Sequence, residues 1–269
     1  MPPSRSRKDQ AGHIARQRGL QGMIQGSRKT WRRWQACGDM FSVARARASA
    51  LARTIAPRDN RFMNPSALVP AIILAGGRAT RLGGGDKCLL DLGGRPMLAR
   101  IIDRLAPQCD PLALNANGDA ARFGGFGLPV LPDSLPGFPG PLAGILAGMD
   151  WAAGLGADRV VSVAGDTPFF PRDLVPRLRQ SGDGIVLAAS RDGQGRNRDH
   201  PTFGLWPTAL RDDLRAWLIG GERQVRGFAQ SHGAVAAIWD ADPFDPFFNV
   251  NTPEDLDRAR SLLCRKPAA

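Results

Sequence analysis

The stretch from Ala71 to Lys87 constrains the fold of this chain more than any other part of its sequence. Its first four residues form a short apolar run, which is typical of a buried strand. Five glycines follow within ten residues, together with the basic side chains of Arg78, Arg81 and Lys87. Glycine lets backbone N–H groups approach an anion closely, and basic side chains add charge-assisted hydrogen bonds to phosphate oxygens. The stretch therefore predicts a strand that leads into a phosphate-binding loop.

Two common phosphate-binding motifs do not fit this loop. A Walker A loop ends in Gly-Lys-Ser/Thr, whereas Lys87 lies between Asp86 and Cys88. The glycines also fit no register of the dinucleotide-binding pattern G-x-G-x-x-G. A solvent-exposed glycine-rich turn with scattered arginines is the alternative to phosphate binding, and the loop alone leaves it open.

The formal net charge of +11 comes from the first 66 residues. They hold fourteen of the 36 basic and three of the 25 acidic residues, which leaves 22 of each kind in the remaining 203. Two hundred and three residues can bury a full core as one domain. We therefore expect a basic, disordered extension over residues 1–66, with Met63 as the alternative start of translation, and a single domain over residues 67–269.

A working role for the basic extension is the alternative. It would be an arm that binds nucleic acid or a helix that lies on a membrane surface. Binding to nucleic acid depends on clustered cations, and the neutral domain carries no such excess of positive charge. We therefore expect the domain to bind neither nucleic acid nor a membrane.

The sequence lacks the features of secreted, membrane-spanning and metal-thiolate proteins. Its four cysteines form no C-x-x-C pair, and its three histidines have no metal-ligand spacing. It contains no run of about eighteen apolar residues and no apolar segment typical of a secretion signal. We therefore expect a cytoplasmic protein with reduced thiols.

Predicted strands and helices alternate from Ala71 onwards. We expect strands at residues 71–74, 111–114, 129–131, 159–163, 185–189 and 235–239, and helices from residue 96, at 141–153, at 209–219 and from residue 253. Residues 197–202 are expected to form a polar loop that leads into residues 203–206. This alternation predicts an α/β fold with an open, mostly parallel sheet and helices on both faces.

Polar residues and glycines recur where the predicted strands end. They are Gly76 and Gly77, Asn115, Asp133 and Asp166. The carboxyl ends of parallel strands meet at one edge of a sheet, and open α/β sheets bind their ligands there. We therefore expect one ligand site at this edge.

The residue types at this edge favour phosphate chemistry, which needs positioned cations and a divalent metal more than covalent catalysis. Asp166 is the candidate Mg²⁺ ligand, and a helix-capping aspartate is the alternative. Lys87 and Arg81 are expected to neutralise charge on the α-phosphate and the leaving group, and exposed surface cations are the alternative.

Four further residues have a chemical and a structural interpretation. Asn115 could bind a base or ribose and Asp133 a guanine amino group, but either residue could simply form an Asx turn. Asn251 is a candidate second metal ligand or a helix cap. His200 is either on the substrate side or an ordinary loop histidine.

The stretch from Leu74 to Lys87 resembles the signature LAGG-x-x-x-R-M-GG-x-DK of the molybdenum cofactor guanylyltransferases, a branch of the nucleotidyltransferases. The resemblance spans roughly residues 70–263 and continues in order through Asn115-Ala-Asn117, Asp133-Ser-Leu135, Gly140-Pro-Leu-Ala-Gly144, Asp166-Thr-Pro168, Asp199-His-Pro-Thr202 and Asn249-Val-Asn-Thr-Pro-Glu254. It implies a three-layer, Rossmann-like fold of the nucleotide-diphospho-sugar transferase type.

The resemblance also implies roles for individual residues. It implies GTP contacts from Leu74, Ala75, Gly76, Gly77, Gly84, Lys87, Asn115, Asp133, Gly144 and Asp166. It implies Mg²⁺ at Asp166 and Asn251, a functional Arg81 and Gly140, and substrate-side roles for Asp199, His200, Arg223 and Asn249. The implied reaction is attack by the terminal phosphate of Mo-molybdopterin on the α-phosphate of GTP, which releases pyrophosphate. Molybdopterin-biosynthesis proteins and molybdoenzyme chaperones are the implied protein partners.

The chain departs from the family pattern at three places. Leu82 replaces the usual Met, and Gln224 stands where some relatives carry a second Arg, which bears on the pterin-side contacts. The 66-residue extension has no counterpart in the pattern. The rival assignments are the molybdenum cofactor cytidylyltransferases and the sugar-phosphate nucleotidyltransferases, which typically read LAAG where this chain reads Leu74-Ala-Gly-Gly77.

Overall fold

The computed structural model describes residues 68–77, 84–135, 137 and 140–264 of the chain. All of these residues belong to one compact unit, Ser66–Ala269. The extension expected over residues 1–66 lies outside the described residues, as do Arg78 and Arg81. Among the described helices, none has the length and apolar character needed to cross a membrane.

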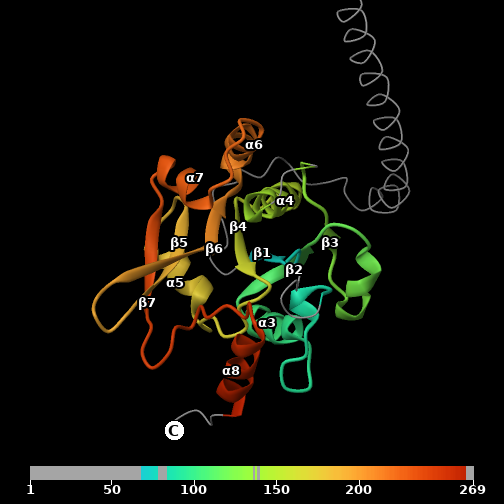
Figure 1. The fold of residues 1–269 in the computed structure, drawn as a ribbon. Coiled ribbons are helices and arrows are strands. Elements are labelled where there is room, and N and C mark those ends of the chain that lie inside the picture. The colour runs from blue at the N-terminus through green and yellow to red at the C-terminus, as the bar shows by residue number, and fades with distance from the viewer. Residues whose placement is uncertain (1–67, 78–83, 136, 138–139, 265–269) are drawn as a thin grey trace, which may run out of the picture. The chain divides into compact units, whose positions relative to one another are not determined.

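The described residues form a seven-stranded sheet with the strand order β3-β2-β1-β4-β6-β5-β7 (Figure 1). Only β6 runs antiparallel to its neighbours, β4 and β5, while the other neighbouring strands pair in parallel. The prediction of an open, mostly parallel sheet is therefore confirmed. The strands are β1 (Val69–Leu74), β2 (Cys109–Asn115), β3 (Val130–Leu131), β4 (Arg159–Ala164), β5 (Val186–Arg191), β6 (Asn197–Pro207) and β7 (Val235–Asp240).

Helices cover both faces of the sheet, as predicted (Figure 1). Successive side chains of a strand point to opposite faces. In β1, Ala71 and Ile73 accordingly belong to one apolar core and Ile72 to the other. A strand buried on both sides reads as a continuous apolar run, which is the pattern of residues 71–74. The first core contains α3 (Met97–Leu105), α5 (Leu174–Ser181) and α8 (Pro253–Cys264), and the second contains α4 (Pro141–Gly154), α6 (Arg211–Ile219) and α7 (Val225–Ser231).

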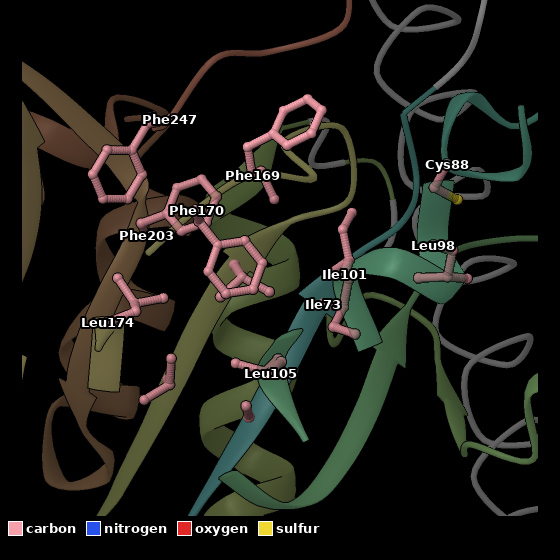
Figure 2. Packing of buried hydrophobic residues seen from close by; sticks show 14 of the residues in the cluster. Ile73, Cys88, Leu98, Ile101, Leu105, Phe169, Phe170, Leu174, Phe203 and Phe247 are labelled. Carbon is pink, nitrogen blue, oxygen red and sulfur yellow. The ribbon is translucent and has the colours of Figure 1, made fainter. Parts of the chain in front are cut away.

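Aromatic side chains join the second half of the chain to the first core. Figure 2 shows Phe170, Phe203 and Phe247 gathered beside the β1 and α3 residues of this core. The ring centroids of Phe203 and Phe170 lie 5.6 Å apart, and those of Phe203 and Phe247 lie 5.1 Å apart. Because Phe247 is buried here, the segment between β7 and α8 is held against the sheet close to Asn249.

The prediction of a polar loop at residues 197–202 is wrong. Strand β6 begins at Asn197, and its first residues pair with the end of β5, from Arg191 opposite Asn197 to Ala188 opposite His200. The Asn, Asp and Pro residues of this segment have low strand propensity, but pairing with β5 overrides propensity. The register shifts after Ala188, so residues 201–203 bulge out between the two paired stretches.

Two short helices, α5 and α7, were not expected from the sequence. They span eight and seven residues, which is too short for a strong helical period. In α7 the buried residues Val225, Phe228 and Ala229 have the i, i+3, i+4 spacing of one helix face. Three 3₁₀ turns complete the described elements: η2 (Lys87–Leu89), η3 (Ala120–Phe126) and η4 (Thr208–Leu210).

Candidate active site

A cavity of about 470 Å³ lies at the carboxyl edge of strands β1, β2 and β4. The residues that follow these strands and β3 line it together, so the expectation that they share one edge is confirmed. The predicted site residues in its wall are Leu74, Ala75, Gly76, Gly77, Lys87, Asn115, Asp133, Gly140, Asp166 and Asn249. Their roles in binding remain predictions.

On one side of the cavity the Lys87 ammonium contacts two acceptor oxygens, one on Asp166 in the cavity wall and one on Asn251, which is not among the described lining residues. The Lys87 ammonium donates a hydrogen bond to Asp166 Oδ2 at 2.7 Å and another to Asn251 Oδ1. The Lys87 side chain is only 10% exposed and that of Asp166 is 25% exposed, so water screens this ion pair only in part. Three of the residues chosen from the sequence therefore meet at one point, although 164 positions separate Lys87 from Asn251.

The start of α8 holds Asn251 in this cluster. Asp255 Oδ2 accepts from the backbone N–H groups of Asn251 and Thr252 at 2.9 and 3.0 Å. The Thr252 hydroxyl in turn accepts from the Asp255 N–H at 3.2 Å, which completes a reciprocal capping box. The helix start predicted from Thr252 and Pro253 is therefore confirmed, and it fixes the backbone next to the Asn251 side chain.

Thr167 links Asn249 to Asp166. Its buried hydroxyl lies 2.6 Å from Asn249 Oδ1 and 3.1 Å from Asp166 Oδ1. The Val250 N–H also donates to the Asp166 carbonyl at 2.9 Å. These contacts connect the loop after β4 to the segment before α8 across 82 positions of sequence. Thr167 was not among the predicted site residues, because its position after Asp166 carries no signal of a distant partner.

The opposite side of the cavity carries a carboxylate held by two amides. Asp133 Oδ1 accepts from Asn115 Nδ2 at 2.9 Å, and Oδ2 accepts from Asn117 Nδ2 at 2.7 Å. Asn117 Oδ1 accepts in return from the Asp133 N–H at 3.0 Å. The two amides thus orient the Asp133 carboxylate, and its remaining lone pairs can accept further hydrogen bonds.

Two glycines allow close packing behind the cavity wall. A Cβ on Gly144 would lie 2.8 Å from both Asn115 Cγ and Leu74 Cδ2. A Cβ on Gly165 would lie 2.7 Å from the Leu74 carbonyl oxygen. Both distances are too short for real contacts, so α4 and the end of β4 approach β1 this closely only with glycine at these positions. Gly144 supports Asn115 from behind and is not among the residues that line the cavity.

Several predicted site residues lie elsewhere. Asp199 pairs with Arg226 at 2.8 Å, and Arg223 is exposed in the segment between α6 and α7. Gly84 is exposed with a φ of 94°. Arg81 is outside the described residues. The wall of the cavity as described does not include Asp199, His200, Arg223 or Gly84.

His200 is buried and not in a loop. Its Nε2 lies 2.8 Å from the Ser190 hydroxyl, and its ring stacks on Phe247 with 4.5 Å between ring centroids. Burial lowers the pKa of His200 from 6.5 to about 4, and the nearby carboxylate of Asp245 opposes this shift only partly. The imidazole is therefore neutral at pH 7.

Cys88 and Thr202 line the cavity although neither was singled out. Thr202 reaches it because the bulge in β6 displaces residues 201–203 from the ladder, and no sequence pattern indicates this bulge. The Cys88 thiol is buried 3.6 Å from the Ala75 carbonyl oxygen, and burial raises its pKa to about 12. It therefore stays protonated at neutral pH and is a poor nucleophile.

The chain is similar in sequence to several known proteins. The sequence profile of the MobA-like NTP transferase domain matches residues 71–235. A protein of Rhodopseudomonas palustris named molybdenum cofactor guanylyltransferase is 52% identical over 203 residues, covering 73% of this chain and 94% of the relative. A protein of the same name from Cereibacter sphaeroides is 52% identical over 197 residues, covering 73% and 97%.

Among solved structures, the molybdopterin-guanine dinucleotide biosynthesis protein A of Archaeoglobus fulgidus is similar in fold, with a TM-score of 0.55 and 20% identity. The similarity covers 72% of this chain and 98% of that one. The identity of about half to the curated relatives, over nearly their whole length, is much stronger evidence than the shared fold. The chain belongs to the molybdenum cofactor guanylyltransferases, within the family that shares the MobA-like NTP transferase domain.

Proposed function

We propose that this protein transfers GMP from GTP to the terminal phosphate of Mo-molybdopterin. The products are the guanine dinucleotide form of the cofactor and pyrophosphate. The observation that carries the proposal is the pair of clusters in the wall of one cavity: Lys87 with Asp166, and Asp133 with Asn115. Asn251 joins the first cluster through its hydrogen bond from Lys87. The first suits phosphates, and the second suits the donor groups of a purine base.

The phosphates are assigned to the side of Lys87. Gly76 and Gly77 lie in the same wall, and among the described residues, their chain neighbours aside, no atom lies within 4 Å of a Cβ built on either glycine. Their backbone is therefore open on the cavity side to an approaching ligand. The Lys87 ammonium is the cation placed to neutralise the charge that develops on phosphate oxygens during transfer.

The guanine is assigned to the side of Asp133. A carboxylate accepts hydrogen bonds from N–H groups, and a guanine presents such donors at its ring nitrogen and exocyclic amino group. Asn115 and Asn117 already hold this carboxylate in place, so little order is lost when a base binds. The Asn115 amide nitrogen donates to the Leu131 carbonyl and to Asp133, and the Asn115 amide packs closely against Gly144 of α4.

The oxygen donors fit a magnesium ion. Asp166 Oδ2 and Asn251 Oδ1 both accept from the Lys87 ammonium, so the two oxygens already converge on one cation. Magnesium is usually held by one or two carboxylates with waters and substrate phosphates, and does not need a larger protein cage. A bound Mg²⁺ would supply positive charge to the phosphate oxygens. Asp166 and Asn251 would hold it, and Thr167 and Asn249 would keep Asp166 oriented.

The direct test is to incubate the full chain with GTP, Mg²⁺ and Mo-molybdopterin and to measure pyrophosphate. We expect release that requires all three components and stops when EDTA removes the metal. The same assay with CTP is the control for nucleotide choice. Release that is faster with CTP than with GTP would contradict the guanine assignment, and an undiminished rate in EDTA would contradict the metal.

A further inference from the structure

One arginine joins the two loops that form opposite sides of the cavity. The first is the glycine-rich loop, residues 75–87, of which residues 78–83 are outside the described part. The second is the asparagine loop, residues 115–119, which follows β2. Arg122 lies directly after the asparagine loop, in the 3₁₀ turn η3. It does not line the cavity itself, so it has no part in the binding contacts assigned above.

The Arg122 guanidinium contacts both loops at once. Its Nε donates to Asp86 Oδ2 at 2.6 Å, in the glycine-rich loop. Its two terminal nitrogens donate to the backbone carbonyls of Asn117, at 2.7 Å, and Asp119 in the asparagine loop. The Arg122 and Asp86 side chains are 26% and 18% exposed, which makes this a half-buried pair with two extra acceptors. An isolated surface ion pair has neither feature and contributes little to the stability of a fold.

The asparagine loop is shaped to receive the guanidinium. Gly118 has a φ of 85°, which L-residues rarely adopt, and this turn presents the carbonyls on either side of it to Arg122. Asp119 then starts η3 by accepting from the Ala121 N–H at 2.9 Å. The guanidinium also lies over the Phe123 ring, with 4.5 Å from Cζ to the ring centroid.

Two contacts of Arg122, those to Asp86 and Asn117, each lead to one of the two clusters. Asp86 directly precedes Lys87, whose backbone N–H donates to the Gly77 carbonyl at 3.1 Å and closes the glycine-rich loop. Asn117, whose carbonyl accepts from Arg122, uses its side chain to hold Asp133. A triphosphate on one side and a base on the other are covalently joined in GTP. The two clusters must therefore keep a fixed separation to bind both parts together.

We propose that Arg122 is a positioning residue that fixes the glycine-rich loop relative to the asparagine loop and thereby sets the affinity for the nucleotide. This inference rests on the function proposed above. The Asp86–Arg122 link therefore affects the affinity for the nucleotide and not the binding of Mo-molybdopterin. Lysine cannot replace arginine fully, because three acceptors in different directions need the fork of guanidinium donors.

The test measures GTP affinity by calorimetry in the full chain, together with kcat and the KM values for GTP and Mo-molybdopterin. Arg122→Ala should raise the Kd and KM for GTP roughly tenfold to a hundredfold, as expected for losing a residue that orients binding groups. The KM for Mo-molybdopterin should stay within the error of the unmodified protein. Arg122→Lys should recover part of the GTP affinity, because an ammonium can still pair with Asp86.

Arg100→Ala is the matched control. Arg100 also holds a turn through backbone carbonyls, those of Leu92 at 2.6 Å and Gly93 at 2.8 Å, but this turn does not line the cavity. We expect this variant to keep the GTP affinity. Asp86→Ala combined with Arg122→Ala should cost no more GTP affinity than Arg122→Ala alone, because alanine at position 122 already removes the link to Asp86.

Unchanged GTP affinity in Arg122→Ala would overturn the inference, as would equal increases in the KM values for both substrates or additive effects in the double variant. If Arg122→Ala does not fold, as judged by circular dichroism, the Arg122→Lys and Asp86→Ala variants carry the same comparison. The proposed function is tested separately by the unmodified chain. If that chain binds another nucleoside triphosphate more tightly than GTP, the guanine assignment fails, and the link is then measured with the preferred nucleotide.

Discussion

At the scale of single residues, Lys87 connects the glycine-rich loop to the oxygen groups at the carboxyl edge of the sheet. It comes from the glycine-rich loop, yet its ammonium contacts Asp166 after β4 and Asn251 before α8. The family signature indicates the importance of Lys87 and Asp166 separately. Their direct contact is visible only in the folded chain, because it joins positions 79 residues apart.

Lys87→Ala is expected to lower kcat by on the order of 10² to 10³, the usual cost of removing one group that stabilises transition-state charge. A steady-state pyrophosphate assay measures this loss. Arg95→Ala is the matched control, because it removes a 2.7 Å ion pair with Asp103 in which both side chains are about half exposed. A Lys87→Ala protein that turns over as fast as the control would remove Lys87 from the reaction.

Gly144→Ala tests the support behind Asn115. The added Cβ meets Asn115 and Leu74 at distances that force them to move, so we expect a loss of about 1–3 kcal/mol in the free energy of unfolding and weaker GTP binding. Gly154→Ala in the same helix α4 has nothing within 4 Å of the new Cβ and should be neutral or slightly stabilising. Urea unfolding and calorimetry measure both effects. Equal GTP affinity in the two variants would contradict this role of Gly144.

At the scale of elements, the sequence predicts some parts of the site well and others poorly. The start of α8 follows from Thr252, Pro253 and the acidic first turn, because capping depends on neighbouring residues. Strand β6 does not follow from residues 197–202, because its pairing with β5 is decided by a partner elsewhere in the chain. The same reason explains why the positions of Thr202 and His200 could not be derived.

The buried position of His200 in β6 predicts a pH-dependent stability. Its folded-state pKa of about 4 is lower than its ordinary value of 6.5, so the unfolded chain binds a proton first as the pH falls. The stabilising effect is complete above pH 6.5 and is lost as the pH falls towards 4. Between pH 7 and pH 5 the loss is about 2 kcal/mol.

Urea unfolding of the unmodified chain and of His200→Gln at both pH values measures this effect. The glutamine variant has no titrating group at this position, so it should lose about 2 kcal/mol less than the unmodified chain between pH 7 and pH 5. Parallel pH dependence of the two proteins would show that His200 is not held neutral by the fold.

At the scale of the whole molecule, the site is built at one edge of the sheet by segments from both ends of the domain. The first half supplies the glycine-rich and asparagine loops, and the segment before α8 supplies Asn249 and Asn251. The alternation of strands and helices predicts this shared edge, because parallel strands present their carboxyl ends together. It does not predict the exact contacts across the cavity, which depend on side-chain packing between distant segments.

A chain that begins at Met63 tests whether the domain binds GTP and catalyses the reaction without the first 62 residues. Every described residue of the cavity wall falls between Leu74 and Asn249. We therefore expect the shortened chain to keep the GTP affinity and the rate of the full chain when both are measured side by side. Loss of either property would show that the first 62 residues contribute to the function.

The most direct test of the central claim is a crystal structure grown with GTP and Mg²⁺. We expect the guanine beside Asp133 and Asn115, the phosphates beside Lys87 and the glycine-rich loop, and the metal between Asp166 and Asn251. A structure in which the nucleotide binds elsewhere, while Lys87 keeps its hydrogen bonds to Asp166 and Asn251, would contradict it.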